Sequence, residues 1–139
     1  MGIPVGMGTD ATRISTYNPW MAIHWLLTGE TIGGMQFWPK EEALDKFTAL
    51  QLYTSGSAWC SGEENEKGKI IKGMYADMVI LSDDYFSILP EKVKKIESLM
   101  TIVNGKIVYS AGDYKSYNPS IPAVIPDWSP VKYYGGYQK

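Results

Sequence analysis

The first apolar run of the chain is short, broken by glycines and followed closely by an acidic residue. It is GIPVGMG, residues 2–8, and Asp10 comes two positions later. A short apolar run bounded by glycines is typical of a parallel strand that is covered on both faces. We therefore predict a buried strand over residues 3–8, although the neighbouring strands that it needs do not precede it in this sequence.

Helical spacing begins after a polar loop. Asn18 followed by Pro19 predicts a helix start, because an asparagine side chain caps the first turn and proline needs no N–H there. Gly29 predicts the end of this helix. The positions that would face inward recur every three or four residues and are Trp20, Ile23, His24 and Leu27.

A second helix is predicted from Lys40 onward. Thr48 is expected to cap a continuation of this helix that reaches Tyr53. The small polar residues and glycines of TSGSAWCSG, residues 54–62, predict that the helix is broken there. The predicted inner face of its first part carries Ala43, Leu44 and Phe47.

The second half of the chain has the pattern of short strands. Residues 69–84 predict a strand, a turn and a second strand, and residues 89–98 allow one or two helical turns. The strongest local pattern is LMTIVNGKIVYS, residues 99–110, in which two β-branched runs flank Asn104-Gly105. That dipeptide favours a two-residue hairpin turn, because both turn positions need a positive φ.

Composition narrows the function by exclusion. A net charge of −2 without a basic cluster gives no electrostatic footprint for nucleic acid. No apolar run reaches the roughly 18 residues of a membrane span. The single cysteine, Cys60, allows no internal disulfide, and the single histidine, His24, allows no His-rich metal site built by this chain alone. One buried strand, two helices and a small antiparallel unit make an unusual domain, which indicates a piece of a larger fold.

Three motifs lie in order along residues 2–115. The first is Gly-Thr-Asp at residues 8–10, and the second is Gly-x-Ile-x-x-Gly-x-x-Ala-Asp followed by apolar residues, at 68–79. The third is the hairpin pattern Val-x-Gly-Lys-x-Val-Tyr at 103–109. Together they resemble the C-terminal end of metal-dependent amidohydrolases, in the branch called amidohydrolase family 3.

This resemblance implies a fold and its division. In that superfamily a TIM barrel carries the metal site, and a small β-sandwich is built from strands of both chain ends. The chain is therefore expected to be an α+β piece. Residues 1–61 would form the eighth strand and following helices of a TIM (β/α)8 barrel, and residues 62–115 part of the composite β-sandwich. Residues 116–139 would be a tail rich in proline and aromatic residues.

The resemblance also implies a chemistry. Active-site residues of such barrels lie at the carboxyl ends of the strands, where Asp10 is placed. By resemblance, Asp10 is a metal ligand and the general base that takes a proton from metal-bound water, in an enzyme that hydrolyses a C–N bond other than a peptide bond. Arg13 and Tyr17 follow in the next loop and are candidate substrate contacts, although surface loops are polar in any case.

The remaining metal-site residues of this family would lie upstream. The expected cofactor is a divalent metal ion, zinc, in the intact enzyme and none in this piece, which is expected to be inactive alone. Without the motifs downstream, Asp10 would be interpreted as a loop aspartate that caps a turn. We expect a structural role for His24, and for Asp77 a role in holding a turn or a backbone amide. Cys60 is expected to be an inert buried thiol.

A second function of another class stays open, namely a binding or interaction module that uses the aromatic tail. The expected partners are a small-molecule substrate and other copies of the chain, with no nucleic acid and no membrane. Self-association is expected because a lone barrel strand and its helices lack their usual cover. The sequence shows no export signal, so the cytoplasm is favoured while the localisation stays unknown. The aromatic residues of the tail include Trp128, Tyr133, Tyr134 and Tyr137.

Overall fold

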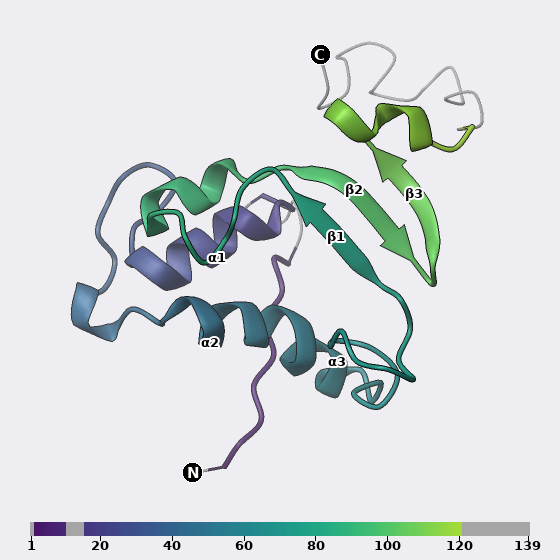
Figure 1. Ribbon diagram of the computed structural model, residues 1–139. Coiled ribbons are helices and arrows are strands. Elements are labelled where there is room, and N and C mark those ends of the chain that lie inside the picture. The colour runs from purple at the N-terminus through teal and green to yellow at the C-terminus, as the bar shows by residue number, and fades with distance from the viewer. Residues whose placement is uncertain (1, 11–15, 121–139) are drawn as a thin grey trace, which may run out of the picture.

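Helices fill the first half of the chain and a small sheet the second (Figure 1). The structure is a computed structural model and describes residues 2–10 and 16–120. The described part combines helices with a three-stranded antiparallel sheet, which confirms the mixed α and β character that we predicted. None of the helices in these two ranges is long and apolar enough to cross a bilayer.

The first helix forms within its predicted limits. α1 covers Pro19–Thr28. The Oδ1 atom of Asn18 accepts the N–H of Trp20 at 3.0 Å and so caps the first turn. Gly29 ends the helix at a φ of 69°, a left-handed conformation that glycine adopts without a steric penalty. The local capping residues therefore fix both ends of α1.

The second helical segment starts later than predicted. Lys40–Glu42 forms only a 3-10 turn, and α2 covers Lys46–Gln51. The cap of α2 is Asp45, whose Oδ1 accepts the N–H of Thr48 at 2.9 Å. Thr48 lies three positions into the segment, so it supplies the capped donor and is not the cap itself.

The same helix also runs further than predicted. A π-helical turn, Leu52–Gly56, joins α2 to α3, Ser57–Cys60, and the three pieces form one helical rod across the stretch that we expected to break. The hydroxyl of Thr54 donates to the carbonyl oxygen of Leu50 at 2.9 Å. Threonine side chains often bond to the backbone in ways that compete with helical hydrogen bonds, but here the hydroxyl bonds to the carbonyl oxygen four residues earlier in the same helix.

The hairpin forms as predicted. β2, Ser98–Val103, and β3, Lys106–Ser110, are joined by Asn104 at a φ of 49° and Gly105 at 73°. Both strands are antiparallel, and β1, Met78–Leu81, pairs with the other edge of β2. The helical turns expected before the hairpin are also present, as a 3-10 helix.

The strand predicted at the start of 69–84 is absent. Ile70 and Ile71 are exposed and belong to no strand. The start of this segment packs against α3 and not along a strand. Gly68 lies so close to the helix that a Cβ on it would be 2.9 Å from the Cβ of Ala58. Without a partner strand, the β-branched pair has no ladder to join.

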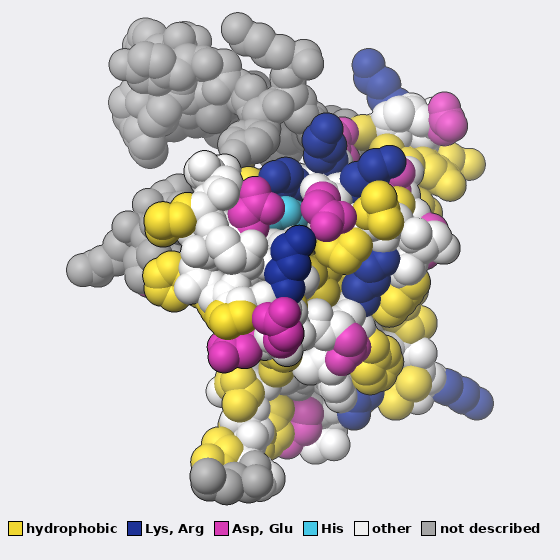
Figure 2. All heavy atoms as spheres, turned by 90° about the vertical axis from the view of Figure 1, so that its left-hand side faces the viewer, with side chains coloured by type: hydrophobic (Ala, Val, Ile, Leu, Met, Phe, Trp, Pro, Cys, Tyr) yellow, Lys and Arg dark blue, Asp and Glu magenta, His cyan; other side chains and the backbone are white. Residues whose placement is uncertain are grey.

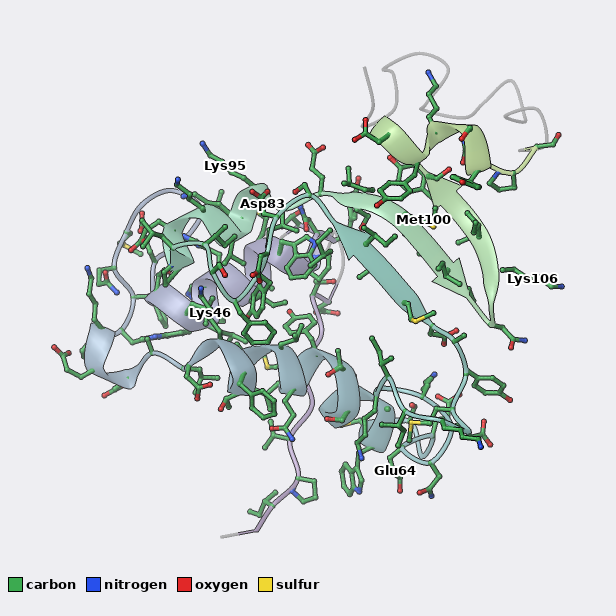
Figure 3. All side chains as sticks on the ribbon, in the orientation of Figure 1. Lys46, Glu64, Asp83, Lys95, Met100 and Lys106 are labelled. Atoms are coloured by element: carbon green, nitrogen blue, oxygen red, sulfur yellow. The ribbon has the colours of Figure 1, made fainter. Side chains whose placement is uncertain are left out.

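The core lies around α1, which runs between the rod and the 3-10 helix Pro90–Lys95 (Figure 1). The Tyr85 hydroxyl donates to the carbonyl oxygen of Lys46 at 2.8 Å. The Lys46 ammonium in turn donates to the carbonyl oxygen of Phe86 at 2.8 Å (Figure 3). These bonds tie α2 to the loop after β1. The buried apolar cluster comprises Ile23, Leu26, Leu27, Ala49, Tyr85, Val93 and Ile96.

Residues 2–10 do not form the predicted strand. They are assigned no regular structure, and in Figure 1 this purple segment crosses the rod. Ile3 is 70% and Val5 54% exposed, so the run is not buried either. A strand needs a neighbouring strand to pair with, and within the described residues none lies along this segment.

Candidate active site

Asp10 is the last residue of the described N-terminal segment, and its side chain is exposed. Its φ of 50° lies in the left-handed region, which residues other than glycine adopt rarely and aspartate more readily than most. The chain therefore changes direction at the last residue of Gly-Thr-Asp. The motif ends on a carboxylate that is open to solvent and to any group brought near it.

The two candidate substrate contacts have different outcomes. Arg13 lies outside the described residues. Tyr17 is half-exposed and borders an open cavity of about 750 Å³, which Trp20 and Lys95 also line. Asp10 is not among the residues that line this cavity, so the structure does not bring Tyr17 and Asp10 into one described pocket.

The segment that carries Asp10 is fastened to the rod through its backbone. The Met7 N–H donates to the carbonyl oxygen of Leu52 at 3.0 Å. The Ser57 hydroxyl donates to the carbonyl oxygen of Met7 at 2.8 Å. Both bonds of Met7 end on the rod, three residues before Asp10. The position of Asp10 therefore depends on a helix more than forty residues further along the chain.

The described residues do not fit a metal site by themselves. Within residues 2–10 and 16–120, no three His, Cys, Asp or Glu side chains lie together so that they could hold a metal ion. Structural zinc sites use four protein ligands and catalytic ones three. Asp10 can thus supply one carboxylate ligand at most, and the others would have to come from other polypeptide.

His24 is held in the interior of the helical layer. Only 2% of its surface is exposed, and its Nε2 has no hydrogen-bond partner among residues 2–10 and 16–120. Burial lowers the pKa of the imidazole, and the nearby Lys94 lowers it further, while Glu30 and Glu91 act in the opposite direction. Figure 2 shows a small part of the histidine, in cyan, between acidic and basic side chains. A buried imidazole on α1 agrees with the structural role that we expected.

The second and third motifs meet at the hairpin turn. The Asp77 Oδ1 accepts the N–H of Asn104 at 2.7 Å. The carbonyl oxygen of Ala76 accepts the N–H of Gly105 at 3.1 Å. The Ala-Asp pair therefore binds both residues of the turn, which confirms that Asp77 holds a turn and a backbone amide.

Cys60 is exposed, and its predicted burial is wrong. It lies near the end of the rod, on the side that the N-terminal segment crosses, and a Cβ built on Gly6 would lie 2.7 Å from its Sγ. Because we expected the helix to end before this position, we did not anticipate that the thiol would lie beside the segment of Asp10.

Sequence reasoning missed the residues that hold the segment. Ser57 and Gly56 lie in the stretch for which the sequence predicts a helix break. Their only signal in the sequence is the small-residue pattern Ser-Gly-Ser. Such a pattern is typical of turns. Here its glycine lets the backbone of the rod lie close to the backbone of the N-terminal segment.

A family model described as "Amidohydrolase family" matches residues 1–109. Among curated proteins, the chain is 41% identical over 70 residues to YtcJ of Bacillus subtilis (strain 168), which is assigned as an amidohydrolase; the match covers 50% of this chain and 13% of that protein. It is 29% identical over 108 residues to the N-substituted formamide deformylase of Arthrobacter pascens, over 78% of this chain and 20% of the enzyme.

A solved amidohydrolase structure contains a region with a similar fold. The chain is similar to an amidohydrolase from Thermotoga maritima MSB8 with a TM-score of 0.53 and 21% identity, over 79% of this chain and 24% of that one. The chain thus spans less than a quarter of each of these three proteins. The family model, in contrast, matches most of the chain and includes all three motifs. The chain belongs to the amidohydrolase family.

Proposed function

We propose that this chain is the C-terminal portion of a metal-dependent amidohydrolase that hydrolyses a C–N bond other than a peptide bond. Two facts support this: the family match over residues 1–109 and the small share of each relative that the chain spans. One relative is named for the removal of formyl groups from N-substituted formamides, which is a reaction of this class.

In the complete enzyme, residues 3–8 would be the last strand of the barrel and Asp10 would lie at its carboxyl end. The observation that carries this proposal is the exposed Asp10 carboxylate at the end of a segment fastened to the following helical rod. The hairpin unit would complete part of a β-sandwich with strands from the rest of the enzyme.

The proposed role of Asp10 is that of general base and single metal ligand from this chain. A positioned carboxylate accepts a proton from the attacking water and returns it to the leaving nitrogen. A divalent ion, zinc in our proposal, would lower the pKa of a bound water and polarise the substrate carbonyl. Because the described residues supply only one ligand, the chain by itself is proposed to be inactive.

Asp10→Asn in the complete enzyme tests this role. An amide neither accepts the proton nor balances the charge of a cation, so kcat should fall by roughly 10²- to 10⁴-fold. Asp83→Asn is the matched control, because Asp83 is an exposed aspartate whose carboxylate accepts a hydrogen bond from the neighbouring Ser82 hydroxyl at 2.8 Å. A folded, metal-loaded Asp10→Asn enzyme with near-normal kcat would show that Asp10 is not the base.

Arg13 and Tyr17 are proposed as contacts of the small-molecule substrate in the loop after this strand.

For the isolated chain we propose self-association, which is supported by the apolar side chains left at its surface, among them Ile3, Trp59 and Ile70. Exposed apolar patches of this kind are commonly covered by another chain. Sedimentation of the purified chain tests this, and a monodisperse monomer at micromolar concentration would contradict it.

A further inference from the structure

We propose that Asn104 is a site of spontaneous deamidation, and that Ala76 and Asp77 protect it as long as the hairpin turn is closed. Asn104 and Gly105 form the only Asn-Gly pair in the sequence. Both residues are exposed, and Figure 3 shows their turn next to the labelled Lys106, at the end of the hairpin. This inference is independent of the proposed catalytic function.

Deamidation at such a pair needs no enzyme and no co-reactant except water. The backbone nitrogen of Gly105 loses its proton to hydroxide and attacks the side-chain carbonyl carbon of Asn104. The C–N bond of the side-chain amide breaks, and its nitrogen takes up a proton and leaves as ammonia. Water then opens the resulting succinimide ring at either carbonyl group, which gives aspartate or isoaspartate. Glycine favours the ring closure, because it has no side chain to obstruct the approach.

The other asparagines provide an internal comparison. Asn18 and Asn118 precede proline, whose nitrogen carries no proton to lose. Asn65 is exposed but precedes Glu66, whose side chain hinders the attack. Sequence and exposure therefore single out Asn104 among the four asparagines of the chain.

Two hydrogen bonds from outside the hairpin hold this turn closed. The Asp77 Oδ1 accepts the N–H of Asn104 at 2.7 Å, and the carbonyl oxygen of Ala76 accepts the N–H of Gly105 at 3.1 Å. We call these two bonds the turn clasp. The second bond engages the same proton that the reaction must remove.

The turn clasp opposes the reaction in two ways. A hydrogen-bonded N–H is harder to deprotonate, because the bond to the Ala76 oxygen is lost with the proton. Negative charge that develops on the Gly105 nitrogen also lies next to the peptide unit that the Asp77 carboxylate binds, and like charges repel at such short range. Deamidation of the folded chain therefore proceeds through a local opening of the turn, and its rate follows the fraction of molecules in which the clasp is broken.

The products of the reaction cannot close the clasp as tightly as the asparagine did. Isoaspartate adds a methylene group to the backbone of a two-residue turn, whose fit depends on the length of the loop. Aspartate brings a second carboxylate close to that of Asp77, and the two repel each other. Each product also adds one negative charge to a chain whose net charge is −2. Deamidation would thus weaken the link between the start of β1 and the hairpin turn irreversibly.

The test follows the purified 139-residue chain during storage in mildly alkaline buffer, by peptide mapping with mass spectrometry. Modification should appear at Asn104 and not at Asn65. Asp77→Ala should raise the rate about 5-fold, which is the change in the open population that the loss of one ordinary hydrogen bond gives. Asp83→Ala is the matched control and should leave the rate unchanged, because the Asp83 carboxylate accepts a hydrogen bond from the neighbouring Ser82 hydroxyl.

The same measurement in concentrated urea gives the rate without protection. The unfolded wild-type chain should react faster than the folded chain, and Asp77→Ala should lose most of its difference from the wild type there. Gly105→Ala should lose most of the reaction in urea, because the methyl group hinders ring closure. Asn104→Asp, which imitates one product, should lower the free energy of unfolding of the folded chain, and Asp77→Asn in the same molecule should recover part of that loss.

Each part of the proposal has its own contrary outcome. If Asn104 is not modified even in the unfolded chain, it is not a deamidation site. If the folded and unfolded chains react at the same rate, or if folded Asp77→Ala reacts no faster than the wild type, the turn clasp gives no protection. Should Asp77→Ala fail to fold, Asp77→Asn takes its place. It keeps an oxygen acceptor but loses the charge, and it should also react faster than the wild type.

Discussion

The hairpin of β2 and β3 and the N-terminal segment both consist of short apolar runs next to glycine. The hairpin forms paired strands, whereas the N-terminal segment forms no regular structure. In the hairpin, Asn104 and Gly105 turn the chain back on itself, and the two strands pair with each other. Residues 2–10 have no strand beside them in the part of the chain that the structure describes, and they lie as irregular chain across a helix. In the hairpin, each strand finds its pairing partner within about a dozen residues of the same chain. The N-terminal segment has its strand partners, in our proposal, in other polypeptide.

The two aspartates of the family motifs show the same contrast. Asp77 acts inside the chain, because it binds the Asn104 amide directly. Asp10 belongs to no group of three His, Cys, Asp or Glu side chains that could hold a metal ion among residues 2–10 and 16–120. Asp77 belongs to a local structure that this chain forms by itself, whereas Asp10 has, in our proposal, its fellow metal ligands in other polypeptide. Substitutions in each region should therefore have very different effects on the stability of this chain.

The largest effect is expected from a buried side chain of the hairpin unit. Met100 on β2 is 7% exposed (Figure 3), and Met100→Ala should lower the free energy of unfolding by about 2–4 kcal/mol through lost burial and a cavity. Urea denaturation of the 139-residue chain at fixed concentration measures this. Val103→Ala, at an exposed position of the same strand, is the matched control. Equal costs for the two variants would mean that the hairpin unit has no core of its own.

Glycines provide the next comparison. Gly105 has a φ of 73°, so Gly105→Ala should cost about 1–2 kcal/mol from left-handed strain, although there is space for the new methyl group. A Cβ on Gly8 would meet no atom of the described residues within 4 Å, and its φ lies outside the positive range, so Gly8→Ala should change stability by less than about 0.5 kcal/mol. A neutral Gly105→Ala would contradict the need for positive φ at both turn positions.

These regions also differ in how far the sequence predicts them. The caps of α1 and the turn of the hairpin were predicted because each depends on residues within a few positions of one another. The two ends of the helical rod were not, although a helix in its first part was, since Asp45 and the π turn act through geometry that small polar residues also adopt in loops. For the candidate site, the motif identified Asp10, but nothing in the sequence links Ser57 to Met7, because that bond spans 50 positions.

Removal of the Asp77 carboxylate should have a smaller effect than strain in the turn. Asp77→Ala leaves the Asn104 amide without its partner, but the bond is exposed and water replaces it in part. We expect a loss of about 1 kcal/mol in the free energy of unfolding, together with faster hydrogen exchange of the Asn104 amide. Asp77→Asn keeps an oxygen acceptor and should lie between the wild type and Asp77→Ala. If Asp77→Ala instead abolished binding of metal in the complete enzyme with its fold intact, Asp77 would belong to the active site.

The smallest effect in this chain is expected at Ile3, and it separates the two regions most sharply. Ile3 is exposed here, so Ile3→Ser should change the free energy of unfolding of the 139-residue chain by no more than about 0.5 kcal/mol. In the complete enzyme, residues 3–8 are proposed to be a barrel strand covered on both faces, where burial of an isoleucine is worth roughly 1.5–3 kcal/mol. The same substitution should therefore be several times more costly there. Urea denaturation of both forms measures the difference. An Ile3→Ser change that is equally mild in the complete enzyme would show that the N-terminal segment gains no cover from the rest of the protein, and that its path across the rod is already its final one.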